Sequence, residues 1–114
     1  MGHDHYGIKI TDECTRMLRR IGKKHGRSAY DHLKDLIREL EFEPEKKGQA
    51  LGGPLKGLYS LHYARFRVIY RVEHPRSLVV VVATGYHASS TRRDIYEVLT
   101  RLVEKGDLDW GDGA

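Results

Sequence analysis

The segment from Arg65 to Val72 constrains the fold more than any other, because its side chains alternate with the period of a β-strand. One face is apolar, with Phe66, Val68, Tyr70 and Val72, and the other carries Arg65, Arg67 and Arg71 around Ile69. Arginines two positions apart on a strand face lie about 6.6–7 Å from one another and repel. We therefore expect this face either to meet an anionic partner or to lie in solvent with its arginines paired to nearby carboxylates.

The sequence around this segment predicts the rest of a sheet. Leu78–Ala83 is apolar on both faces, which is typical of an interior strand that is covered on either side. The sequence His-Pro-Arg-Ser at 74–77 predicts a hairpin turn between the two strands that flank it. The strands that we expect run over residues 6–10, 55–63, 65–73 and 78–86.

Two helices are expected between the first strand and the others. Thr11 can cap the first helix, and the basic turn between Gly22 and Gly26 is expected to end it. Ser28 opens the second helix, with Asp31 at the spacing of a capping box. Their apolar stripes are Cys14, Met17, Leu18 and Ile21, and Leu33, Leu36, Ile37 and Leu40. These residues, the cysteine included, are expected to be core.

The second helix is followed by a break and the chain closes with a third helix. Glu43-Pro44 stops the second helix, and the basic segment 45–54 is expected to be a mobile loop. Thr91 and Asp94 repeat the capping-box spacing ahead of a last apolar stripe. That stripe consists of Ile95, Val98, Leu99 and Leu102.

The order strand, helix, helix, strand, strand, strand, helix predicts an α+β fold. We expect an antiparallel β-sheet with an N-terminal helical hairpin and a C-terminal helix packed on it. Residues 1–104 are expected to form a single domain, because 114 residues suffice for one core. Residues 105–114 are expected to form an acidic C-terminal tail that Leu108 and Trp110 can attach to the body.

Positive charge is concentrated in the middle of the chain. Residues 46–93 hold nine Lys and Arg against one acidic residue, whereas residues 1–45 are balanced. Such a basic block is typical of proteins that bind nucleic acid or acidic proteins. The single cysteine allows no internal disulfide, and neither a secretory leader nor a membrane-spanning run is evident. We therefore expect a cytoplasmic protein, and the sequence predicts no metal site and no cofactor.

Two phrases in this sequence resemble a known family. Residues 54–61, P-L-K-G-L-Y-S-L, followed by R-F-R-V-I-Y-R-V at 65–72, are similar to the "L-x-G-...-R-V-I-Y" core of the RelE/ParE superfamily of type II toxins. Residues 92–96, R-R-D-I-Y, resemble the family's "R-R-D-V-Y" ending. The resemblance extends from Tyr6 to about Leu102, which is most of the chain.

In its RelE branch, the resemblance implies a ribosome-dependent messenger-RNA endonuclease that inhibits translation. The RNA 2'-hydroxyl attacks the adjacent phosphate there without a metal, so the site needs a base, an acid and cations. The resemblance places Arg67 at the scissile phosphate with Arg65 assisting, and His87 in an acid–base role. Ser60 and His62 stand where RelE has a pair of lysines, so His62 is a second candidate proton donor.

Tyr96 matches the family's late tyrosine, and it is either a residue that stacks on a base or a half-buried packing residue. The basic side chains expected to contact the RNA backbone are Lys46, Lys47, Lys56, Arg71, Arg92 and Arg93. The alternative is a ParE-like inhibitor of DNA gyrase, or a non-catalytic antitoxin-binding or regulatory member. Every version implies a cognate antitoxin that is acidic and partly disordered, and the nuclease hypothesis adds the ribosome and messenger RNA as partners.

Overall fold

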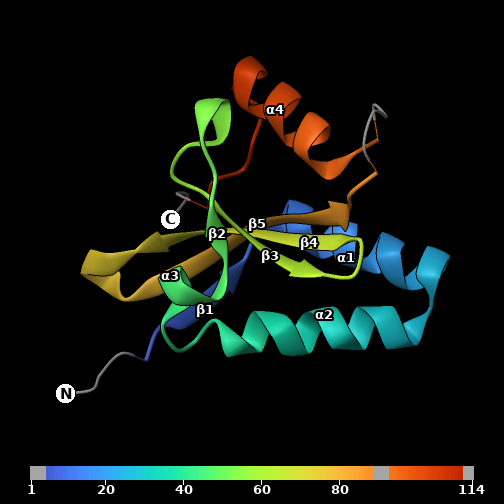
Figure 1. Ribbon diagram of the computed structural model, residues 1–114, viewed down its shortest axis with the longest axis horizontal. Helices are drawn as coiled ribbons and strands as arrows, with labels where there is room; N and C mark the ends of the chain where they lie inside the picture. The colour runs from blue at the N-terminus through green and yellow to red at the C-terminus, as the bar shows by residue number, and fades with distance from the viewer. Residues whose placement is uncertain (1–4, 89–92, 112–114) are drawn as a thin grey trace.

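A five-stranded sheet lies between two layers of helices in the computed structural model, which describes residues 5–88 and 93–111. Helices α1 and α2 cover one face of the sheet, and α4 crosses the other (Figure 1). The elements are β1 (Gly7–Ile10), α1 (Asp12–His25), α2 (Arg27–Glu39), α3 (Pro44–Lys47), β2 (Gln49–Ala50), the 3-10 turn η1 (Gly53–Leu55), β3 (Tyr59–Tyr63), β4 (Phe66–Glu73), the 3-10 turn η2 (His74–Arg76), β5 (Leu78–Tyr86) and α4 (Ile95–Lys105). The expected α+β class is confirmed.

The strand order is β1-β5-β4-β3-β2. Strands β2 to β5 are antiparallel to their neighbours, as expected, but β1 runs parallel to β5, so the sheet is mixed. The interior position predicted for the apolar strand is confirmed, because β1 and β4 flank β5 and residues 79–83 are fully buried. The strand expected over residues 55–63 is shorter in the structure, because β3 begins at Tyr59 and η1 occupies part of the preceding segment.

A β-bulge in β5 decides which face its end presents. Ile69 of β4 pairs with Ala83, while the next residue, Tyr70, pairs with Val81, so Val82 has no partner in β4. The extra residue reverses the alternation beyond it. As a result, Tyr86 lies on the α1 side of the sheet, and His87 lies on the α4 side.

Each face of the sheet has its own core. The core beneath α1 and α2 includes Cys14, Leu18, Leu33, Val68 and Tyr70, so the prediction that the cysteine is core is confirmed. Burial raises the pKa of the Cys14 thiol to about 12. The core beneath α4 contains Leu58, Ile69, Val80, Val82, Ile95 and Leu99. The sheet is thus buried on both faces around β4 and β5. The predicted site residues lie at its open end, where the β3–β4 turn adjoins the end of β5.

The helical hairpin differs from the expectation at its turn. Thr11 caps α1, since its Oγ1 accepts from Cys14 N at 3.1 Å, but the helix continues through its basic residues to His25. Gly22 therefore lies inside α1. Gly26 reverses the chain with φ at 100°, which glycine adopts readily, and it also serves as the N-cap of α2. Ser28 consequently lies within α2 and does not cap it. Thr91 lies outside the described residues.

The segment expected to be a mobile loop forms α3, β2 and η1 instead. Pro44 begins α3, where its missing N–H costs nothing. The buried Tyr70 hydroxyl donates to Pro44 O at 2.7 Å, and Lys47 Nζ donates to Glu39 O at 2.8 Å. These bonds join the segment to the sheet and to α2.

Residues 106–111 pack against the body. Leu108 is buried and Trp110 contacts the same core beneath α4. Arg71 Nε donates to Trp110 O at 2.9 Å, and Lys9 Nζ donates to Gly111 O at 3.1 Å. Within the described ranges, no helix has the length and apolar composition needed to cross a membrane.

Candidate functional site

Four of the five predicted catalytic side chains come together on the α4 face, at the open end of the sheet. His62 of β3 and Arg67 of β4 are direct cross-strand partners. His87 follows β5, and Tyr96 stands in the first turn of α4, with its ring 5.2 Å from the His87 ring. The sequence spacing of these residues is large, so only the sheet register and the docking of α4 unite them.

Arg67 is half-buried rather than fully exposed on this face. Its Nη1 donates to Ala64 O at 3.0 Å and to Phe66 O at 2.9 Å, which holds the guanidinium against the β3–β4 turn. Its Nε is buried and has no hydrogen-bond partner among the described residues. A buried donor without a partner costs free energy, so the fold leaves one polar atom of Arg67 unsatisfied by the described part of the chain.

His62 is exposed beside Arg67. Burial of the ring by its neighbours, followed by the charges of Arg67 and His87, lowers the pKa of His62 below its ordinary value. This shift favours the neutral imidazole, which is the form that can accept a proton.

His87 is held by both its backbone and its ring. The backbone N–H donates to Arg65 O at 2.6 Å, and the ring Nδ1 is hydrogen-bonded to Asp94 Oδ1. Arg65 itself lies in the exposed two-residue turn between β3 and β4, and its carbonyl anchors His87.

Tyr96 joins α4 to the sheet. Its hydroxyl is 2.7 Å from Ser60 Oγ, and Ser60 is buried. Tyr96 is thus half-buried, and it also makes a polar contact within the site. Its ring also meets the His87 ring edge-on, so the same side chain is both a packing residue and a neighbour of a predicted catalytic residue.

Asp94 is the residue of this site whose role the sequence prediction missed. It had been expected only as the second member of a capping box with Thr91. Its carboxylate instead caps α4 itself, accepting from Tyr96 N at 3.0 Å and Glu97 N at 3.4 Å, and it also bonds His87. The sequence does contain a signal for the capping role, because an aspartate directly before an apolar helical stripe stands at the position where an N-cap is preferred.

The predicted RNA-contacting lysines are dispersed. Lys47 lines a groove of about 360 Å³ beside the β2–β3 edge, together with His62. Lys46 is exposed and pairs with Glu43 at 3.3 Å. Lys56 is exposed and directly follows η1. Only the first of these lysines therefore adjoins the cluster around Arg67.

The predicted arginines outside the cluster occupy different environments. Arg71 lies near the other end of β4, where it is paired with Glu73 at 2.9 Å and bonded to Trp110, so the structure does not bring it to the site. Arg92 lies outside the described residues. Arg93 is exposed and lines a pocket on the other side of β5.

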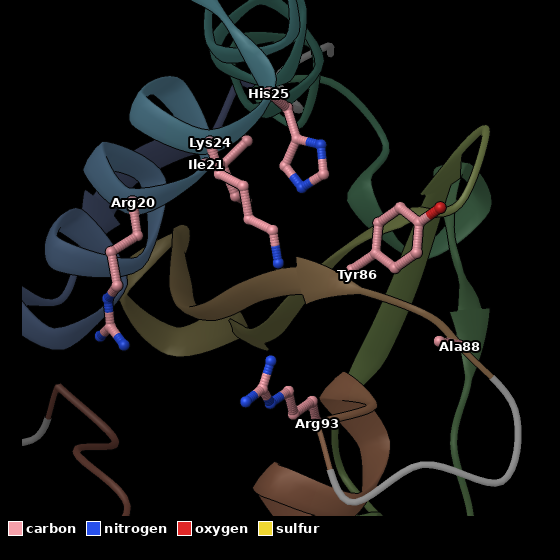
Figure 2. Close-up of a pocket in the computed structure, with 7 residues that line it drawn as sticks. All are labelled: Arg20, Ile21, Lys24, His25, Tyr86, Ala88 and Arg93. Carbon is pink, nitrogen blue, oxygen red and sulfur yellow. The ribbon is translucent and has the colours of Figure 1, made fainter.

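That pocket has a volume of about 490 Å³ and lies between α1 and the end of β5. Its lining consists of Arg20, Ile21, Lys24, His25, Tyr86, Ala88 and Arg93. Lys24 reaches down from α1 and Arg93 reaches up from the start of α4 toward the same stretch of β5 (Figure 2). The Tyr86 ring stacks on His25 with centroids 5.5 Å apart, and none of these described lining residues is acidic. An aromatic wall with converging cations suits a nucleotide.

No group of three or more metal-ligating side chains occurs in the part of the chain that the structure describes. The groups that the site presents are two imidazoles, a guanidinium, a phenol and a buried carboxylate.

Comparison with known proteins agrees with this architecture. The sequence model of the family described as the ParE toxin of the type II toxin–antitoxin system parDE matches residues 8–90. No curated protein sequence matches the chain significantly.

Among solved structures, a chain of the toxin–antitoxin complex RelBE2 from Mycobacterium tuberculosis is similar with a TM-score of 0.65 and 20% identity, covering 73% of this chain and 99% of that chain. The YoeB/ParE toxin from Agrobacterium tumefaciens gives a TM-score of 0.61, 21% identity, and coverage of 72% and 99%. A free-state mutant of the E. coli toxin RelE gives 0.59, 22% identity, and coverage of 89% and 97%.

At these identities the structural similarity concerns the fold, and the family match covers most of the sequence. It includes the strand that carries Arg67 and ends before α4. The chain therefore belongs to the ParE toxin family of type II toxin–antitoxin systems, within the RelE/ParE superfamily.

Proposed function

We propose that this toxin is a ribosome-dependent endonuclease of messenger RNA that works without a metal. The observation that carries the proposal is the convergence of His62, Arg67, His87 and Tyr96 at one end of the sheet. A ribonuclease of this kind needs a proton acceptor, a proton donor and a fixed positive charge within reach of one phosphate. These side chains supply all three.

The reaction assigns one role to each group. Neutral His62 takes the proton of the RNA 2'-hydroxyl, whose oxygen then forms a bond to phosphorus. Arg67 binds the phosphate oxygens on which negative charge increases through its guanidinium group. The bond from phosphorus to the 5'-oxygen breaks, and protonated His87 gives that oxygen its proton. The products are a 2',3'-cyclic phosphate and a 5'-hydroxyl.

Tyr96 and the basic pocket support the path of the RNA. The Tyr96 ring lies at the edge of the site and can stack on a base of the RNA, while its hydroxyl remains hydrogen-bonded to Ser60. The nucleotides beyond the scissile bond pass the end of β5 and reach the pocket with Lys24, Tyr86 and Arg93. On the other side, the groove with Lys47 receives backbone phosphates.

The test is primer extension on a reporter messenger in a reconstituted translation reaction, with naked messenger as the comparison. Wild type is expected to cut only when ribosomes are present. Arg67→Ala and His87→Ala are each expected to lower the cleavage rate by about 100-fold or more, because each removes a group that acts in the transition state. Arg38→Ala removes an exposed arginine paired with Asp35 on α2, and it is expected to cut like wild type.

Intact messenger with a protein that still stops growth would contradict the nuclease proposal. It would favour the second candidate, inhibition of DNA gyrase, for which the observation in favour is the match of residues 8–90 to the ParE family. A supercoiling assay with purified gyrase then decides. Full growth inhibition by Arg67→Ala would show that the proposed nuclease site is wrong.

We also propose an acidic, partly disordered antitoxin as partner. Among the similar structures are toxin–antitoxin complexes, including RelBE2 from Mycobacterium tuberculosis and RelBE from E. coli. The cations of this chain that remain exposed near the site, Arg65 and Arg93 among them, offer charge-assisted hydrogen bonds to such a segment. Cytoplasmic location is part of the same proposal, since ribosomes and gyrase are both there.

A further inference from the structure

Asp94 is a buried carboxylate at the centre of the site, with an exposed fraction of 4%. Its Oδ1 is hydrogen-bonded to His87 Nδ1 and accepts from Ala88 N at 2.9 Å. Its Oδ2 accepts from Tyr96 N at 3.0 Å and from Glu97 N at 3.4 Å. Both oxygens are therefore occupied, one toward the strand end and the other toward the first turn of α4.

This arrangement determines where the His87 ring carries its proton. An ionised carboxylate only accepts hydrogen bonds, so the atom that faces it must be a donor. Three backbone N–H groups point at this carboxylate, which fits acceptor oxygens. The proton of neutral His87 is consequently on Nδ1, and Nε2 is the nitrogen that can exchange a proton with a substrate.

The ring is also fixed in orientation. The His87 backbone N–H donates to Arg65 O at 2.6 Å, and the ring meets the Tyr96 ring edge-on, at an interplanar angle of 73°. A flip that exchanged the two nitrogens would break the bond to Asp94. Orientation and tautomer are thus set by the same carboxylate.

We propose that Asp94 is a positioning residue for His87: it fixes the Nδ1–H tautomer and directs Nε2 to the scissile phosphate. The catalytic consequence rests on the proposed nuclease function, whereas the tautomer does not. Because the same carboxylate caps α4, the docking of this helix and the proton arrangement of His87 are coupled. A change that undocks α4 also leaves His87 without its partner.

The first measurement is the tautomer of His87 in the ¹⁵N-labelled full chain, read from the ring ¹⁵N shifts at pH 8. We expect Nδ1–H alone in wild type. Asp94→Asn and Asp94→Ser keep a good helix cap but lose the carboxylate, so a mixture of the two tautomers is expected. Asp35→Asn makes the same charge change at an exposed position on α2 and is expected to leave the His87 spectrum unchanged.

The second measurement is the single-turnover cleavage rate on programmed ribosomes. In Asp94→Asn and Asp94→Ser the rate is expected to fall about 10- to 100-fold at saturating ribosomes, because part of the acid–base contribution is lost while binding is retained. A residue that only capped α4 would leave both the rate and the tautomer unchanged, since Asn and Ser cap as Asp does.

The outcomes separate this inference from the nuclease proposal. An Nε2–H tautomer in wild type overturns the inference without any RNA experiment, and it also decides the matter if the variants fail to fold. Unchanged tautomer and rate in both variants overturn it as well. A tautomer change in a protein that never cuts RNA supports the positioning by Asp94 and rejects the nuclease function.

Discussion

His62 and Arg67 form a coupled pair at the scale of single residues. They face one another across β3 and β4, and the guanidinium charge is the second cause, after burial, of the lowered pKa of His62. A neutral imidazole beside a permanent cation is the combination that the proposed attack by the 2'-hydroxyl requires, because the base must be unprotonated where the phosphate is bound.

The pKa of His62 is expected to rise toward its ordinary value in Arg67→Ala, because a like charge that opposes protonation has been removed. The measurement is an NMR titration of the His62 ring. Arg65→Ala removes an equal charge from the exposed turn, and Arg65 is not among the causes of the shift, so a smaller rise is expected there. A rise in the Arg65 variant alone would show that the attribution to Arg67 is wrong.

Some residues of the site could be identified from the sequence, and the roles of others could not. Arg67 and His87 could be found from a motif and a strand end. Arg71 shares the alternating pattern with Arg67, yet it is bonded to Glu73 and Trp110, since a pattern predicts a face and not a partner. The bond between Asp94 and His87 joins the residue that follows β5 to the N-cap of α4, which no local pattern reports.

The bulge in β5 is the feature that matters most at the scale of elements. Strict alternation from Val79 would place His87 on the α1 side of the sheet, away from Arg67. The unpaired Val82 shifts the remaining residues by one, so that Gly85 and His87 face α4. Helices α1, α2 and α4 and strands β1, β3, β4 and β5 were predicted from periodicity, but α3 and β2 were not. A bulge inside a run of valines leaves no signature in the sequence either.

Gly85 is expected to be intolerant of a side chain, because it lies where α4 meets the sheet. A Cβ at this position would lie 2.8 Å from Ile95 Cδ1 and 3.2 Å from Ile95 Cβ. Gly85→Ala should therefore displace the start of α4, lower the free energy of unfolding by about 1–3 kcal/mol, and reduce cleavage. Urea denaturation and hydrogen exchange of α4 amides measure these effects.

The matched control for this prediction is Gly52→Ala, where the added Cβ would have no atom within 4 Å. It is expected to leave both stability and α4 exchange unchanged. Equal stability of the Gly85 variant and wild type would mean that α4 can move away from β5 without cost, contrary to its buried contacts through Ile95 and Leu99.

The distribution of positive charge over the folded molecule differs from its distribution along the sequence. The segment 1–45 is neutral in sum, because its acidic residues offset the cations of α1. In space, those acids lie mostly in the first turn of α1 and on α2, whereas Arg20 and Lys24 join Arg93 from the far end of the chain in one pocket. Folding thus extends the basic surface beyond residues 46–93, which a count along the chain could not reveal.

Replacing both pocket cations of α1, in Arg20→Gln/Lys24→Gln, is expected to weaken binding of a fluorescein-labelled single-stranded RNA. The slope of log affinity against log salt should decrease by about 1–1.5, since each phosphate contact releases about 0.7 counterion from a single strand. Fluorescence anisotropy over a salt series measures the slope. Arg27→Gln/Arg38→Gln makes the same charge change at exposed cations paired with Asp31 and Asp35, and a similar loss of slope there would exclude a specific role for the pocket.

During synthesis, β3, β4 and β5 emerge from the ribosome before α4, because α4 follows them in the chain. Asp94 and Tyr96 are consequently the last groups to reach His87 and Ser60. Under the proposed function, β3, β4 and β5 without α4 would hold the arginine and histidines of the site but not the carboxylate that orients one of them. The site is thereby completed by the last of its elements to be synthesised.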